Sequence, residues 1–118
     1  MKKFDNTCTD CINQQFILSL VSIDSVLLKL YDDYILEFEE CIPHDFMSEL
    51  FHYARENSDT ETVKKMLFSM ENTLTRTEFD CIDNIICVSF LEYIDNSSPL
   101  LPILPEKLRA ESDKMWGR

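Results

Sequence analysis

The sequence has 118 residues, of which 45% are hydrophobic and 11% aromatic, and its formal net charge of −11 comes from 22 acidic and 11 basic side chains. This length suits one domain with its own hydrophobic core, and the composition argues against intrinsic disorder. The single glycine, Gly117, argues against glycine-rich phosphate loops and two-residue hairpins, and the acidic charge argues against direct binding to nucleic acid or anionic membranes.

Cysteine number and the first residues bear on the cellular compartment. Five cysteines are an odd number, and Met1-Lys2-Lys3 precedes polar residues, whereas a secretory signal would continue into an apolar segment. The apolar runs are too short to span a bilayer. We therefore expect a cytoplasmic protein with reduced thiols and no membrane segment.

The first two helices are predicted after a flexible tail over residues 1–9. Thr9 or Asp10 caps the first helix, and the second extends from near Ser22 to Cys41 or Ile42, because the following proline disfavours helical geometry in the residue before it. One side of this second helix carries apolar residues at the 3–4 spacing of a core-facing surface, namely Ile23, Val26, Leu27, Leu30, Tyr31, Tyr34, Ile35 and Phe38. We interpret it as the helix around which the rest of the chain is organised.

The third and fourth helices follow the same apolar pattern. Pro43 suits the first turn of a helix that ends near Asn57, and the pair Ser58 and Glu61 has the spacing of a capping box for the next helix. The predicted core residues of these two helices are Phe46, Met47, Leu50, Phe51, Ala54, Val63, Met66, Leu67, Met70 and Leu74.

The C-terminal part contains a fifth helix, a proline-rich segment and a short last helix. Thr75 or Thr77 caps the fifth helix, whose wide apolar arc predicts a central position; a strand at Ile85–Phe90 is the alternative. Its apolar residues are Phe79, Ile82, Ile85, Ile86, Val88, Phe90, Leu91 and Ile94. Three prolines keep the next segment extended, with its leucines and Ile103 against the core, and Pro105 opens a helix with Leu108, Met115 and Trp116.

These elements predict an all-α protein with a single domain over residues 1–118. We expect five to six helices packed as antiparallel hairpins, the second with the third and the fourth with the fifth. HEAT-like stacking of these hairpins is one possible arrangement, although no sequence repeat supports a solenoid.

The second helix and its continuation carry the strongest functional signal. Between Asp24 and Asp59 there are ten acidic residues and two basic ones, so this segment holds −8 of the net charge. The segment has almost no basic residues at the i, i+4 spacing that would pair with these acids. Leu36 lies among the acids, in the way that an apolar anchor lies within the charged rim of a protein interface. A solvated helix face is the simpler interpretation; we favour a protein-binding surface formed by Asp32, Asp33, Leu36, Glu37, Glu39, Glu40, Asp45 and Glu49.

Catalytic and metal-binding motifs are weak in comparison. Glu49 and His52 have the Glu-x-x-His spacing of di-iron bundles, but such a site needs a second motif and two further carboxylates. Cys8 and Cys11 form a C-x-x-C without the second ligand pair of a zinc site or the βαβ context of a redox motif. We predict no catalytic residue, no metal and no cofactor.

Two segments support a family resemblance. The stretch Val63–Glu71, followed by Ile85–Glu92, resembles the helix pair of a bacterial helical family often encoded beside toxins, and the likeness covers Val63 to Trp116. The small, glycine-poor, acidic chain also resembles the helical immunity proteins of polymorphic-toxin and contact-dependent growth inhibition systems. The resemblance is a pattern of apolar positions, so it transfers no catalytic residue.

What the resemblance implies is neutralisation of a cognate toxin by binding. Such toxins are often basic nucleases, and an acidic protein can occupy the field that attracts their substrate. We expect the acidic surface to face Lys or Arg of the toxin, with Leu36 or a nearby tyrosine as anchor. Two alternatives remain open: an adaptor that sequesters a basic host protein, and a small metal-dependent carboxylate-bundle enzyme.

Overall fold

The computed structural model describes residues 9–76 and 80–118, and all regular elements in these two ranges are helical. In chain order they are α1 Thr9–Val21, α2 Ser25–Phe38, α3 Pro43–Glu56, α4 Glu61–Arg76, α5 Asp80–Ser89, η1 Leu91–Tyr93, η2 Leu101–Ile103 and α6 Glu106–Trp116, where η marks a 3₁₀ helix. The predicted all-α class with five to six helices is confirmed. The segment considered as an alternative strand belongs to α5 up to Ser89.

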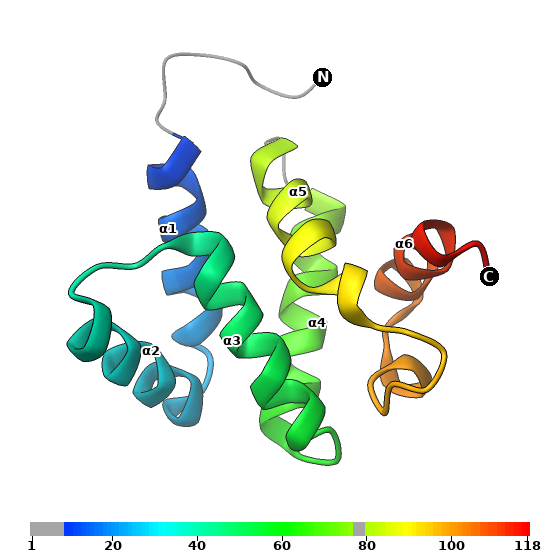
Figure 1. The fold of residues 1–118 in the computed structure, drawn as a ribbon, viewed down its shortest axis with the longest axis horizontal. Helices are drawn as coiled ribbons and strands as arrows, with labels where there is room; N and C mark the ends of the chain where they lie inside the picture. The colour runs from blue at the N-terminus through cyan, green and yellow to red at the C-terminus, as the bar shows by residue number, and fades with distance from the viewer. Residues whose placement is uncertain (1–8, 77–79) are drawn as a thin grey trace.

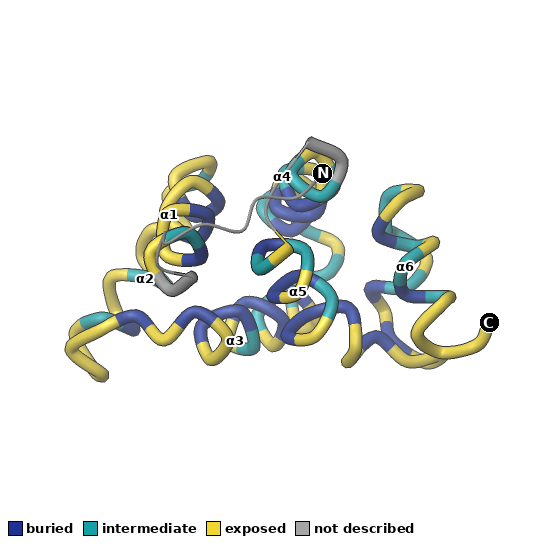
Figure 2. Tube along the Cα trace, turned by 90° about the horizontal axis from the view of Figure 1, so that it is seen from above, coloured by how far each residue is buried: buried dark blue, intermediate teal, exposed yellow. Residues whose placement is uncertain are grey.

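The helices form a slab about two helices thick, with Cα extents of 37 × 35 × 20 Å. Helices α1, α4 and α6 lie in one layer, and α3 and α5 form the second layer in front of them (Figures 1 and 2). Because α5 packs against α1, α3 and α4, its predicted central position is confirmed. Helix α2 instead lies at the edge of the slab, mainly against α1, so it is not the helix around which the chain is organised.

The core contains the apolar faces predicted for the third and fourth helices. All of these residues are buried except Leu74, which is half-buried and packs against the core. In the predicted fifth helix, Phe79 and the proposed cap Thr77 lie outside the described residues, and Val88 is exposed, which corrects its predicted place in the core. From the segment after α5, Phe90, Leu91, Ile94 and Leu100 are also buried, as predicted.

Helix α2 is shorter than predicted at both ends. Asp24 caps it by accepting a hydrogen bond from the Val26 N–H at 2.8 Å. It ends at Phe38, because Glu39 adopts a left-handed conformation with φ 66° and donates its N–H to the Ile35 carbonyl at 2.7 Å. No residue near position 39 signals this ending, since the residue that usually takes this conformation is glycine.

Two local expectations also need correction. Helix α4 begins after Thr60, whose hydroxyl accepts the Val63 N–H at 3.4 Å, so Thr60 caps it in place of Ser58. Helix α3 packs mainly against α5 and meets α2 only near the turn that joins them, so α2 and α3 do not form a regular hairpin. The tail predicted over residues 1–9 lies outside the described residues except for Thr9, which begins α1.

Candidate functional site

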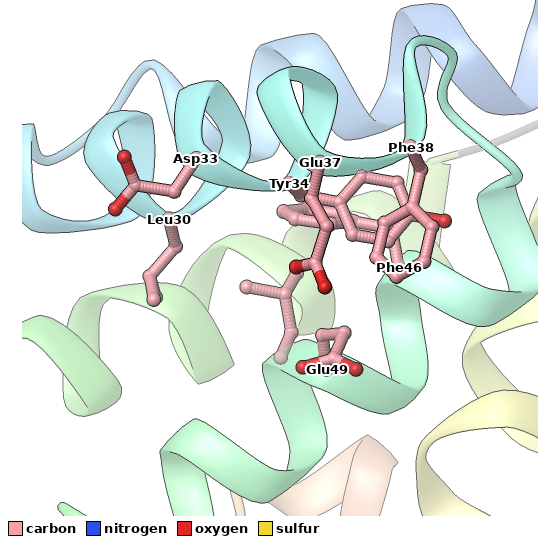
Figure 3. Close-up of a pocket in the computed structure, with 8 residues that line it drawn as sticks. Leu30, Asp33, Tyr34, Glu37, Phe38, Phe46 and Glu49 are labelled. Atoms are coloured by element: carbon pink, nitrogen blue, oxygen red, sulfur yellow. The ribbon is translucent and has the colours of Figure 1, made fainter.

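Helices α2 and α3 diverge from their connecting turn and leave a groove between them (Figure 3). The groove has a volume of roughly 260 Å³ and is lined by Leu30, Asp33, Tyr34, Glu37, Phe38, Phe46, Glu49 and Leu50. A shallower depression continues along α2 past Leu30 and Asp33 to Lys29, Val26 and Ser25. We call the first of these the α2–α3 groove; it combines an apolar base with acidic edges.

Three aromatic rings form one wall of the α2–α3 groove. The ring centroids of Tyr34 and Phe46 lie 5.1 Å apart at 62°, and those of Tyr34 and Phe38 lie 4.8 Å apart at 44°. Tyr34 and Phe46 are buried, whereas Phe38 is 46% exposed at the end of α2. The wall therefore has a buried inner part and one ring that is available to a ligand.

A hydrogen bond between side chains joins the two helices beside this wall. The Tyr34 hydroxyl donates to Asp45 Oδ2 at 2.8 Å, and Asp45 lies in the first turn of α3. Burial of the phenol, and secondarily its bond to the carboxylate, raises the pKa of Tyr34 to about 12. The bond fixes the closed end of the groove.

Carboxylates from both helices border the groove. Asp33 and Glu37 are one turn apart on α2, and Glu49 lies on α3; the side chain of Glu37 extends from α2 toward the side of the opening on which Glu49 lies (Figure 3). Asp33 pairs with Lys29 at 3.3 Å, but both side chains are more than half exposed, so this pair contributes little to stability. Within the described residues, neither Glu37 nor Glu49 forms an ion pair.

The structure thus divides the eight residues of the predicted binding surface. Asp33, Glu37 and Glu49 line the α2–α3 groove. Asp32 and Leu36 lie one turn apart on the exposed side of α2, where Leu36 is 82% exposed. Glu40 does not continue the line of Asp33 and Glu37 along α2, because the helix ends at Phe38. Glu39 and Glu40 are exposed in the connection to α3, and Asp45 is held by Tyr34.

The apolar residues that line the groove were all predicted to lie in the core, on the basis of their helical spacing. Of the eight core residues predicted on α2, only Leu27 and Tyr34 are buried, and Ile23, Val26 and Phe38 are exposed. The apolar arc of α2 is wider than a helix at the edge of the fold can bury, and this width was the signal that some of its residues stay outside the core. The arc alone does not indicate which of its residues face another helix and which face an opening.

Other candidate chemistry receives little support. Glu49 and His52 are both exposed on α3, and the described part of the chain contains no group of three or more potential metal ligands. Cys11 is exposed on α1, while Cys8 lies outside the described residues. Burial raises the pKa of Cys87 to about 11, so this thiol stays protonated and a poor nucleophile at neutral pH.

Residues 22–117 match the family described as a domain of unknown function, DUF7674. The chain belongs to this family. The DUF7674 match extends through α2 and α3 and therefore includes every residue that lines the groove. Neither a curated protein nor a solved structure matches the chain. Among the helices in the described ranges, none combines the length and hydropathy needed to cross a membrane.

Proposed function

We propose that this DUF7674 protein is a non-enzymatic binding protein that captures a basic protein partner at the α2–α3 groove. The observation that carries the proposal is that Glu37 and Glu49 border the same aromatic groove from two helices, without a basic partner from the described residues. A basic partner would neutralise these charges and cover the exposed apolar groups beside them. Protein interfaces typically combine such an apolar centre with a charged rim.

The partner we propose is a cognate toxin domain, in keeping with the resemblance to helical immunity proteins. A nuclease toxin presents basic residues to attract phosphate, and the −11 charge of this chain favours rapid encounter with such a surface. By covering the basic surface of the toxin, the protein would keep the toxin from its substrate. The protein would act in the cytoplasm, where it meets a toxin before the toxin reaches its target.

The competing function is an adaptor that sequesters a basic host protein. The same groove would serve either role, so the identity of the captured partner separates them. Tagged protein would be used to recover partners from the native organism at about 50 mM and about 500 mM salt, because screening weakens exposed charge contacts. A stoichiometric basic toxin that loses activity when mixed with the chain supports immunity; a housekeeping nucleic-acid-binding protein supports the adaptor.

A charge-reversal variant tests whether the groove is the interface. Changing Asp33, Glu37 and Glu49 together to lysine should weaken binding to the recovered partner by at least about 2 kcal/mol, because attraction becomes repulsion. The matched control reverses the exposed acids Glu56, Asp59 and Glu92, which lie away from the groove and produce the same change in net charge. Calorimetric titration measures both. Equal losses in the two variants would show that charge alone, and not the groove, governs binding.

A further inference from the structure

The edges of the α2–α3 groove place two like charges opposite one another. Glu37 approaches from α2 and Glu49 from α3, with Tyr34, Phe38 and Phe46 beside them (Figure 3). Asp33, farther along α2, already has Lys29 as a partner at 3.3 Å. The unneutralised pair therefore lies at the aromatic end of the groove, and Asp33 with its lysine lies at the other end.

A cation between Glu37 and Glu49 would be attracted by both carboxylates and would reduce their mutual repulsion. The neighbouring wall restricts what kind of cation fits. A small hydrated ion gains nothing from the rings of Tyr34 and Phe38, and only two carboxylates meet here, fewer than metal sites commonly use. An organic cation with an apolar stem matches both parts of the lining.

Arginine matches this lining better than lysine does. Its guanidinium is planar, donates hydrogen bonds in more than one direction and stacks on aromatic faces, so it can bridge two carboxylates while lying against a ring. Phe38 offers such a ring, since its side chain is 46% exposed at the groove. A lysine ammonium is compact and strongly hydrated, so it would satisfy the charges with less contact to the wall.

We propose that the α2–α3 groove is an arginine-binding pocket, in which a partner's guanidinium lies between Glu37 and Glu49 and its methylene stem contacts Tyr34, Phe38 and Phe46. This inference rests on the proposed function and adds to it the side chain that anchors the partner. A groove of roughly 260 Å³ accommodates one such side chain. Asp33, already paired, contributes to the surrounding field.

The test uses the full chain and three pentapeptides, acetyl-Ala-Ala-X-Ala-Ala-amide, in which X is arginine, lysine or citrulline. Citrulline has nearly the shape of arginine but no charge. Titration followed by the backbone amide signals of the ¹⁵N-labelled protein should show shifts at Glu37, Phe38 and Glu49. We expect arginine to bind at least about threefold more tightly than lysine, and citrulline not to saturate.

Matched variants separate the groove from general charge attraction. Glu37→Gln with Glu49→Gln should abolish the arginine-dependent shifts, whereas Glu56→Gln with Asp59→Asn should leave them unchanged. Phe38→Leu keeps an apolar side chain without an aromatic face, so it should bring the arginine and lysine affinities to within about twofold. Thermal unfolding of each variant confirms that the fold is retained.

The possible outcomes distinguish this inference from the proposed function. Equal binding of the arginine and lysine peptides, or shifts outside the groove, would overturn the arginine pocket. The proposed function would nevertheless stand if a recovered basic partner were weakened by the groove charge reversals and spared by the control reversals. Conversely, arginine-selective binding at the groove without any recovered basic partner would retain the pocket and contradict the proposed function.

Discussion

Tyr34 connects the fold to the proposed binding surface at the scale of a single residue. Its ring is 5% exposed and contacts Phe46, while its hydroxyl donates to Asp45 at 2.8 Å. A buried phenol needs a hydrogen-bond partner, and the first turn of α3 supplies a carboxylate for it. The same contacts that anchor α2 on α3 thereby set the shape of the groove.

The change Tyr34→Phe removes this hydrogen bond while it retains the ring. We expect the unfolding free energy at pH 8 to fall by about 1–2 kcal/mol, the contribution of one hydrogen bond to a charged group. The loss stays this small because Asp45 is exposed and can bind water in place of the tyrosine. Urea unfolding measures the change. Tyr53→Phe is the control, since the Tyr53 hydroxyl has no hydrogen-bond partner among the described residues, and it should change stability by less than about 0.5 kcal/mol.

The pH dependence of this variant provides an independent check. Folding raises the pKa of Tyr34 from 10.0 to about 12, so folding favours the protonated phenol. Its contribution is complete below pH 10 and is lost as the pH rises from 10 to about 12. The half-buried thiol of Cys87 also favours folding in its protonated form, so both proteins lose stability from pH 9 upward. The fall between pH 10 and 12 should nevertheless be smaller in Tyr34→Phe. Equal falls would contradict the assignment.

The site residues differ in how far the sequence could reveal them. Glu37 and Glu49 are recognisable because carboxylates without nearby bases are conspicuous, and both line the groove together with Asp33, which has Lys29 one turn before it. The position of Glu40 was missed because a glutamate took the left-handed position at residue 39, where no glycine marked the helix end. The role of Phe38 depends on the neighbouring helix, which periodicity along one helix does not describe.

At the scale of the element, α6 depends on a residue from another helix for its N-terminus. Pro105 precedes the helix and has no side-chain acceptor, but the Glu71 carboxylate on α4 accepts the N–H groups of Lys107 at 3.0 Å and Leu108 at 2.9 Å. Free N–H groups in the first turn favour such a negative partner. Glu71 thus caps α6 from α4 and holds the two helices together.

The change Glu71→Ala should lower unfolding free energy by about 1–2 kcal/mol, because two backbone donors lose their acceptor. Amide hydrogen exchange should accelerate in α6, with Lys107 and Leu108 affected first, while α3 keeps its protection. Asn72→Ala is the matched control, since Asn72 is the adjacent exposed residue of α4. Unchanged exchange in α6 would mean that the Glu71 cap does not stabilise the helix.

The individual helices were largely predictable, whereas their arrangement was less so. In α3 and α4 the apolar period coincides with one buried face, and Pro43 marks the start of α3. The start of α4 was misassigned because Ser58 and Thr60 are both good caps, and local sequence does not choose between them. That α3 packs on α5, far from it in the chain, depends on tertiary packing that no local pattern contains.

At the scale of the whole molecule, the net charge of −11 opposes the compact state. The described residues contain few ion pairs that could offset it, and several of these are exposed on both sides, such as Lys64 with Glu61. Repulsion among the remaining acids therefore persists in the folded protein. The negative charge that causes this repulsion would also attract a basic partner. Salt screens both effects, so it should raise the stability of the protein and weaken the proposed binding.

Salt should therefore stabilise the isolated protein while it weakens the complex. Raising sodium chloride from about 10 mM to about 100 mM shortens the screening length from about 30 to about 10 Å, which reduces repulsion between acids on different helices. We expect the unfolding temperature at pH 7 to rise by about 3–5 °C, corresponding to roughly 1 kcal/mol. The groove and control charge-reversal variants both bring the net charge from −11 to −5, so each should show a smaller rise. A fall in unfolding temperature with salt, or an equal rise in the variants, would show that net repulsion does not limit the stability of this fold.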